Sequence, residues 1–133
     1  MSNSKQSNKR TPLVNWLNAY LPPLVWAGVI FIISNQQVLP GTDVFLYDFL
    51  LKKSAHMLVY AVLYWLVYRG VKLTTNSSSV FLHWTLPLVI CLVYAVSDEF
   101  HQHFVPGRYA TMRDIGYDMV GAGAVFLRKY RYI

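Results

Sequence analysis

The sequence contains few charged residues. Asp, Glu, Lys and Arg together make up 14% of its 133 residues, and only six of these are acidic. A typical soluble domain carries about a quarter charged residues, and a domain this short has a large surface to cover with polar groups. The composition therefore argues against an ordinary soluble domain, and we expect lipid to surround the surplus apolar surface.

Several signals of common functions are also missing. The single cysteine, Cys91, cannot form an intramolecular disulfide. There is no H-E-x-x-H pair of the kind that binds catalytic zinc and no repeated pair of broken helices of the kind found in many transporters. We therefore expect no cofactor and no metal, and we rank transport below the other functions.

Four apolar stretches predict an all-α fold. They cover residues 13–33, 55–68, 80–96 and 115–127. The first and third have the length of a membrane span, about 17–25 residues, and the other two reach it only with their polar first turns. We predict a disordered cytoplasmic tail at 1–12 and a four-transmembrane-helix bundle at 13–133. Residues 47–51, between the first two spans, are predicted to form a short interfacial helix.

The distribution of charge predicts the orientation of this bundle. With four spans, eight Lys and Arg residues fall on the side that holds both termini, and all six acids fall on the other side. The positive-inside rule then places both termini in the cytoplasm. We thus predict a multi-pass protein of the cell (cytoplasmic) membrane. The net charge of +6 reflects topology, and we expect no nucleic-acid partner.

Polar side chains cluster at the predicted extracytoplasmic ends of the spans. Lys53, His56 and Tyr60 follow i, i+3, i+7 spacing and so share one helix face, as do Asp114 and Asp118 near the start of the fourth span. The candidate site residues are Ser34, Lys53, His56, Tyr60, Asp98, Glu99, Gln102, Arg108, Asp114 and Asp118. A tight turn at 105–108 would direct Arg108 back towards the acids.

A purely structural role is the alternative for these charges. Lysine and arginine near helix ends often extend to lipid head groups, which is our interpretation of Lys52 and Arg113. An acid at a helix N-terminus, such as Asp114, can be a simple cap. However, ionisable groups at membrane depth are costly and usually mark function. We favour a functional site because so small a protein has little reason to bury so many charges.

Three segments also resemble the VanZ-like family. They are Lys53-Ser54-Ala55-His56 with Tyr60, the D-E-x-x-Q-x-F-x-P-G-R block at 98–108, and Arg113-Asp114 with Asp118 and Gly121. The resemblance extends roughly over residues 26–125 and is most specific in the second segment. It implies an integral membrane protein of a family named for a link to glycopeptide (teicoplanin) resistance, and it names no reaction.

The first functional hypothesis is an enzyme that acts at the outer leaflet on a lipid-linked substrate. Arginine and lysine bind phosphate well, and a carboxylate with a histidine can transfer protons. We expect catalytic roles for Glu99, Asp98, His56 and Asp114, and substrate contacts from Lys53, Arg108, Gln102, Tyr60, Asp118 and Ser34. The expected partners are membrane lipids, with a phosphorylated polyprenyl lipid or a phospholipid as substrate. The alternatives are a non-enzymatic head-group binding or accessory protein and, below it, a small transporter.

Overall fold

A computed structural model describes residues 12–36, 45–76, 79, 81–107 and 111–131. Within these ranges the regular structure is helical and contains no strand, which confirms the all-α part of the predicted fold class. The elements are α1 (Pro12–Ser34), α2 (Phe45–Thr74), the π-helix η1 (Phe81–Thr85), α3 (Leu86–Gln102) and α4 (Met112–Lys129). Most of the tail predicted at 1–12 lies outside the described residues. The helix α1 begins at Pro12. Proline is well suited to this position, because the backbone N–H that it lacks would have no hydrogen-bond partner in the first turn of a helix.

Three of the described helical segments are long and apolar enough to cross a membrane. They are Pro12–Ser34, Leu46–Thr74 and Phe81–Gln102. The helix α4 is not among them, because Arg113, Asp114 and Asp118 lie in its first two turns. These findings support a membrane protein. The fourth span and the orientation of the bundle stay predictions.

The second helix is longer than its apolar stretch indicated. It has 30 residues and begins at Phe45, so the separate interfacial helix predicted at 47–51 is wrong. No glycine or proline interrupts the chain between Phe45 and Arg69, and an ion pair of 2.8 Å joins Lys52 to Asp48 one turn earlier. An i, i+4 pair of opposite charge supports a continuous helix.

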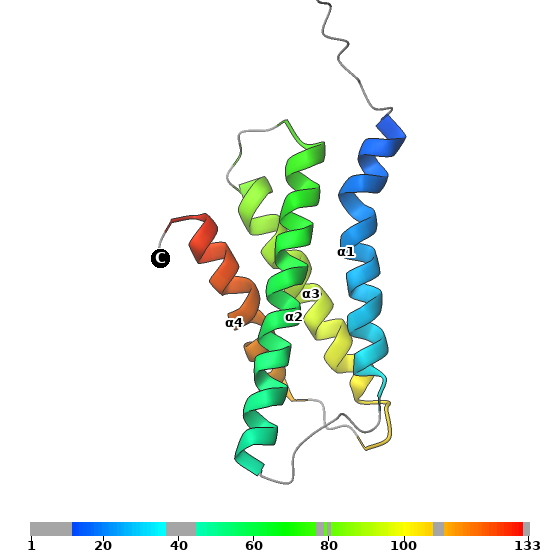
Figure 1. Ribbon diagram of the computed structural model, residues 1–133, viewed down its shortest axis with the longest axis vertical. Helices are drawn as coiled ribbons and strands as arrows, with labels where there is room; N and C mark the ends of the chain where they lie inside the picture. The colour runs from blue at the N-terminus through cyan, green and yellow to red at the C-terminus, as the bar shows by residue number, and fades with distance from the viewer. Residues whose placement is uncertain (1–11, 37–44, 77–78, 80, 108–110, 132–133) are drawn as a thin grey trace, which may run out of the picture.

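The helices alternate in direction, as Figure 1 shows. The C-terminal ends of α1 and α3 lie at the same end of the molecule as the N-terminal ends of α2 and α4, so α2 and α4 run parallel. The described acids belong to segments at this shared end: Asp48, Asp98, Glu99, Asp114 and Asp118. We call it the acidic end. Arg69, Lys72, Arg128 and Lys129 belong to the opposite ends of α2 and α4.

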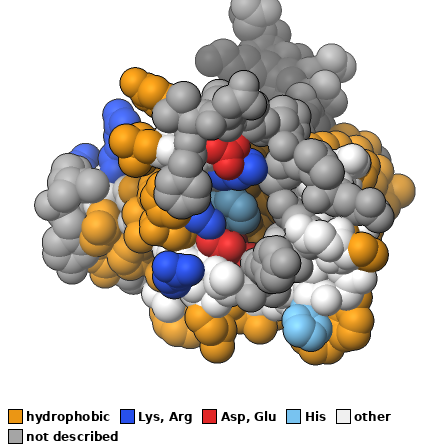
Figure 2. Space-filling view, turned by 90° about the horizontal axis from the view of Figure 1, so that it is seen from below, with side chains coloured by type: hydrophobic (Ala, Val, Ile, Leu, Met, Phe, Trp, Pro, Cys, Tyr) orange, Lys and Arg blue, Asp and Glu red, His pale blue; other side chains and the backbone are white. Residues whose placement is uncertain are grey.

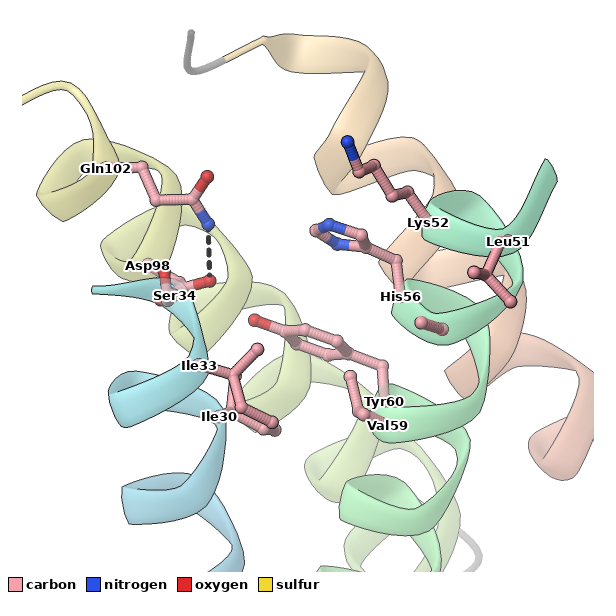
Figure 3. A pocket seen from close by; sticks show the side chains of 11 residues that line it. Ile30, Ile33, Ser34, Leu51, Lys52, His56, Val59, Tyr60, Asp98 and Gln102 are labelled. Carbon is pink, nitrogen blue, oxygen red and sulfur yellow. Dashed lines mark hydrogen bonds between the residues drawn. The ribbon is translucent and has the colours of Figure 1, made fainter. Parts of the chain in front are cut away.

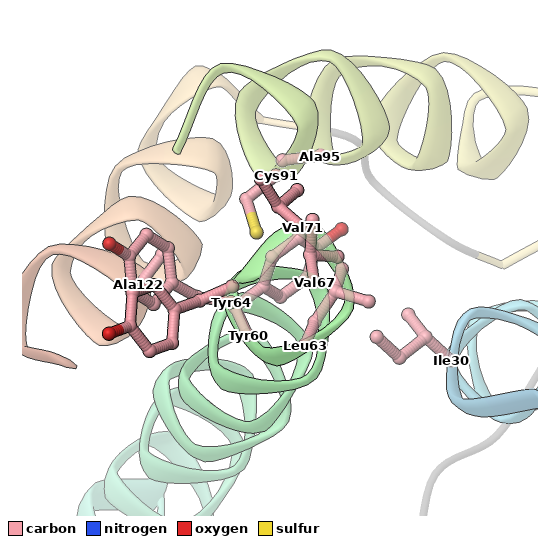
Figure 4. Packing of buried hydrophobic residues seen from close by; sticks show 10 residues of the cluster. Ile30, Tyr60, Leu63, Tyr64, Val67, Val71, Cys91, Ala95 and Ala122 are labelled. Atoms are coloured by element: carbon pink, nitrogen blue, oxygen red, sulfur yellow. The ribbon is translucent and has the colours of Figure 1, made fainter. Parts of the chain in front are cut away.

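The buried core is built around α2 (Figure 4). Tyr60, Leu63, Tyr64, Val67 and Val71 recur every three or four residues and form its buried face. The other helices contribute fewer residues to this core, namely Ile30, Cys91, Ala95 and Ala122. Because α2 supplies most of the core, it is the helix against which the candidate site residues are positioned.

Large apolar side chains also cover the outside of the molecule. Leu24, Leu58 and Val93 are 68%, 65% and 64% exposed. A soluble monomer rarely exposes contiguous apolar surface of this extent. In lipid, the same side chains would lie in a matching solvent, which agrees with the three apolar helices.

Small residues permit close contact between helices at two places. A Cβ atom on Gly70 would lie 2.7 Å from the carbonyl oxygen of Ala19, so α1 and α2 approach closely there. A Cβ atom on Gly121 would overlap the backbone of Met57, so α4 packs directly on α2. Backbone contact of this kind is typical of helices packed in membranes.

Candidate functional site

Two charged pairs join α2 to α4 at the acidic end. Lys53 Nζ forms an ion pair with Asp114 Oδ1. One turn further along both helices, His56 Nδ1 lies 2.9 Å from Asp118 Oδ1. The pairs align because α2 and α4 run parallel and the contact of Gly121 with Met57 holds their axes together.

Both carboxylates of these pairs lie where little water reaches them, so each needs a partner in the protein. The side chain of Asp118 is fully buried and that of Asp114 is 12% exposed. A buried carboxylate without a partner would be strongly destabilising. The ammonium group of Lys53 also lies over the ring of Tyr117, 5.2 Å from its centroid, which adds a cation–π contact.

The end of α3 contributes a second group of buried polar side chains. Gln102 Nε2 donates a hydrogen bond of 3.0 Å to Asp98 Oδ2. The backbone N–H of Thr111 donates to Glu99 Oε2 at 2.9 Å. Thr111 is the N-cap residue of α4, so Glu99 pairs a backbone N–H at the start of that helix that has no partner within the helix. Glu99 therefore holds the start of α4 in place.

A pocket of about 270 Å³ lies between α1, α2 and α3 at the acidic end. Figure 3 shows that its walls carry apolar side chains on α1 and α2, while polar groups from all three helices face one another across it. The apolar lining residues are Ile30, Ile33, Leu51, Ala55 and Val59, and the polar ones are Ser34, Lys52, His56, Tyr60, Asp98 and Gln102.

The candidate residues thus fall into two groups. Ser34, His56, Tyr60, Asp98 and Gln102 line the pocket. The remaining described candidates lie outside its lining and act between helices: Lys53, Glu99, Asp114 and Asp118. Arg108 lies outside the described residues. His56 belongs to both groups, because it lines the pocket and is hydrogen-bonded to α4.

Lys52 is a pocket residue that the sequence analysis did not include. We interpreted it as a lysine extending to lipid head groups, yet it lines the pocket beside His56. The i, i+4, i+8 spacing of Lys52, His56 and Tyr60 was the available signal, since such residues lie on neighbouring parts of one helix surface. Lys53 follows an equally regular i, i+3, i+7 spacing with His56 and Tyr60, so spacing alone favours neither lysine as the pocket residue.

Metal ligands do not converge in the described part of the chain, where no group of three or more His, Cys, Asp or Glu side chains could hold a metal ion. His103, one helical turn after Glu99, is exposed and packs edge-on against Phe104.

A family model described as VanZ/LLP1 matches residues 1–128. The chain belongs to the VanZ/LLP1 family. No curated protein and no solved structure matches it. The match confirms the resemblance to the VanZ-like family and covers more of the chain than the segments at 26–125 on which that resemblance rested.

In this VanZ/LLP1 protein the polar groups are visible from the acidic end. Figure 2 shows acidic, basic and histidine side chains gathered near the middle of this face, with hydrophobic side chains around much of its edge. The described charged groups of α2, α3 and α4 therefore lie close together at the acidic end, next to the pocket. This is the part of the molecule from which a function can be argued.

Proposed function

We propose that this VanZ/LLP1 protein acts at the outer leaflet of the cytoplasmic membrane on a phosphate-bearing lipid or a lipid-linked cell-envelope precursor. The observation that carries the proposal is the pocket between α1, α2 and α3, which combines apolar walls with buried polar groups. A contribution to teicoplanin resistance, which the family resemblance implies, is part of the same proposal.

The orientation needed for this role is a four-span bundle with both termini in the cytoplasm. Its support is the separation of charge: the described acids lie at one end of the bundle, whereas Arg69, Lys72, Arg128 and Lys129 lie towards the other. Basic residues predominate on the cytoplasmic side of membrane proteins. The acidic end, and the pocket with it, would then face the outer leaflet.

An amphiphilic ligand fits the division of the pocket lining. Its hydrocarbon would contact Ile33, Leu51 and Val59, which carry no polar side-chain atoms. Its phosphate would lie near Lys52, whose ammonium group supplies a positive charge on the α2 side. Arg108, close in sequence to the end of α3, is proposed as a second phosphate ligand.

The histidine of the pocket has the arrangement of a general acid or base. Asp118 holds Nδ1 of His56, so Nε2 is the ring nitrogen that can exchange a proton with a bound lipid. A carboxylate behind a histidine orients the ring and stabilises its protonated form. We therefore propose His56 as the proton-transfer residue and Asp118 as its positioning residue, in preference to Glu99, which is hydrogen-bonded to the start of α4.

The phosphate ligands can be tested by the lipids that co-purify with the protein. In the variants Lys52→Gln and Arg108→Ala, we expect a phosphorylated lipid to be reduced about tenfold or more, because each change removes a charge-assisted hydrogen bond. Mass spectrometry of extracted lipids provides the measurement. The variant Arg113→Ala, which removes an exposed basic residue at the same end, is the control and should keep the lipid. An unchanged lipid profile in both test variants would contradict the proposal.

Binding without turnover is the second candidate function. It is favoured by the ion pair of Lys53 with Asp114, which joins two helices and leaves fewer free charges for chemistry. The variant His56→Gln separates the two functions, since glutamine can replace a hydrogen bond and cannot act as a base near neutral pH. If the protein is an enzyme, we expect conversion of the co-purifying lipid to fall at least about a hundredfold, with lipid binding retained. Wild-type protein that binds the lipid and leaves it unconverted would instead support the binding role.

A further inference from the structure

Three buried polar atoms in the pocket have no hydrogen-bond partner in the described part of the chain. They are Ser34 Oγ, Tyr60 Oη and Asp98 Oδ1, and their residues are only 3%, 1% and 5% exposed. They come from α1, α2 and α3, and Figure 3 shows the hydroxyl of Tyr60 directed across the pocket towards Ser34 and Asp98. We call these three atoms the unpaired cluster.

An unpaired cluster of this kind is costly to the protein alone. A buried donor or acceptor that lacks a partner destabilises the fold, and the large majority of buried polar atoms in proteins are paired. Here three such atoms border one pocket, on three different helices. Their common position indicates that a bound group completes their hydrogen bonds.

The chemistry of Asp98 indicates what that group must supply. Its Oδ2 atom already accepts a hydrogen bond from Gln102, and an ionised carboxylate can only accept. Its Oδ1 atom therefore requires a donor. A phosphate oxygen cannot fill this role and would be repelled by the carboxylate, whereas Ser34 and Tyr60 can each donate or accept.

We propose that the unpaired cluster is a subsite for a hydrogen-bond donor, a hydroxyl or an ammonium group, carried by the head group beside the phosphate. This inference rests on the proposed function, because it assumes that a phosphate-bearing lipid occupies the pocket. The phosphate lies on the side of Lys52 and His56, and the donor group reaches the side of Ser34 and Asp98. The positive charge of Lys52 at one side of the pocket and the carboxylate of Asp98 at the other thus orient the head group.

Three phospholipids with identical acyl chains test the subsite. Phosphatidylcholine has no N–H or O–H donor, phosphatidylglycerol has two hydroxyls, and phosphatidylethanolamine has an ammonium group. In native mass spectrometry of the full chain with equal amounts of each, we expect phosphatidylglycerol or phosphatidylethanolamine to be bound about tenfold more than phosphatidylcholine. Which of the two is preferred distinguishes a hydroxyl from an ammonium ligand.

Variants of the unpaired cluster test whether it causes the preference for the lipids that carry a donor. We expect Asp98→Asn and Tyr60→Phe to bring the preference towards parity, because they weaken binding of the two donor-bearing lipids more than binding of phosphatidylcholine. The variant Tyr64→Phe is the matched control, because this buried tyrosine lies one turn away and its hydroxyl donates to the carbonyl of Trp84 outside the pocket. It should keep the preference. Lys52→Gln should instead weaken binding of all three lipids alike.

The possible outcomes separate the subsite from the proposed function. Equal binding of the three lipids, still dependent on Lys52, would overturn the donor subsite and leave the phosphate-lipid function standing. A preference that survives both Asp98→Asn and Tyr60→Phe would also overturn it. Failure of all three lipids to bind would overturn the donor subsite, while the lipids that co-purify with the protein decide the proposed function separately.

Discussion

Replacing Gly121 by alanine is expected to destabilise the bundle by about 2–3 kcal/mol, near the top of the usual range for overpacking. The added Cβ atom would overlap the backbone of Met57, and a backbone cannot rotate away as a flexible side chain can. The helices α2 and α4 must therefore separate. The separation also lengthens the contact between His56 and Asp118, so under the proposed enzymatic role of His56 lipid conversion should fall together with stability.

The fourth helix supplies its own controls for this experiment. Gly116 and Gly123 have no atom within 4 Å of an added Cβ, so alanine fits at both. Alanine is favoured over glycine in a helix by up to about 1 kcal/mol, and Gly116→Ala and Gly123→Ala should be neutral or slightly stabilising. Thermal unfolding in detergent micelles measures all three. A midpoint for Gly121→Ala equal to those of the controls would show that α4 does not pack directly on α2.

Replacing Lys53 by methionine should destabilise the protein by about 3 kcal/mol, because it leaves the carboxylate of Asp114 buried without its partner. The two side chains are 20% and 12% exposed, so water screens their interaction only in part. The double variant Lys53→Met with Asp114→Asn removes both charges and should recover a large part of the loss. Equilibrium unfolding of the single and double variants in micelles gives the coupling between the two residues.

The neighbouring lysine is the matched control for this change. Lys52 is also paired with an acid, Asp48, but the pair lies within one helix and its side chains are 36% and 24% exposed. Such pairs contribute at most about 1 kcal/mol, so Lys52→Met should have a small effect on stability. Equal losses for Lys52→Met and Lys53→Met would contradict a specific link between α2 and α4.

Helical periodicity predicted which residues share a face, but it could not predict which helix each face meets. The spacing of Lys53 with His56, and of Asp114 with Asp118, placed each pair on one face. That these two faces meet depends on the parallel course of α2 and α4 and on the contact at Gly121. These are properties of packing between distant segments, so spacing within one helix carries no information about them.

The same limit applies to the roles assigned within the site. Glu99 or Asp98 is predicted to act as the general base, and nothing in the sequence indicates that Glu99 accepts a hydrogen bond from the backbone N–H of Thr111, which is far from it in the chain. By contrast, Pro106 and Gly107 predict a tight turn from sequence alone, and Gly107 has a φ of 80°, a conformation that favours glycine. The extension of α2 back to Phe45 was missed because hydropathy marks where a helix is apolar and not where it begins.

The pairing of α2 with α4 also affects how the protein is made. A ribosome synthesises α2 well before α4, so in a four-span topology Lys53 and His56 reach the membrane before Asp114 and Asp118 exist. Unpaired charges at membrane depth are costly, and α4 by itself is not apolar enough to count among the spanning helices. In that topology, α2 is apolar enough to insert first, whereas stable insertion of α4 would depend on its docking against α2.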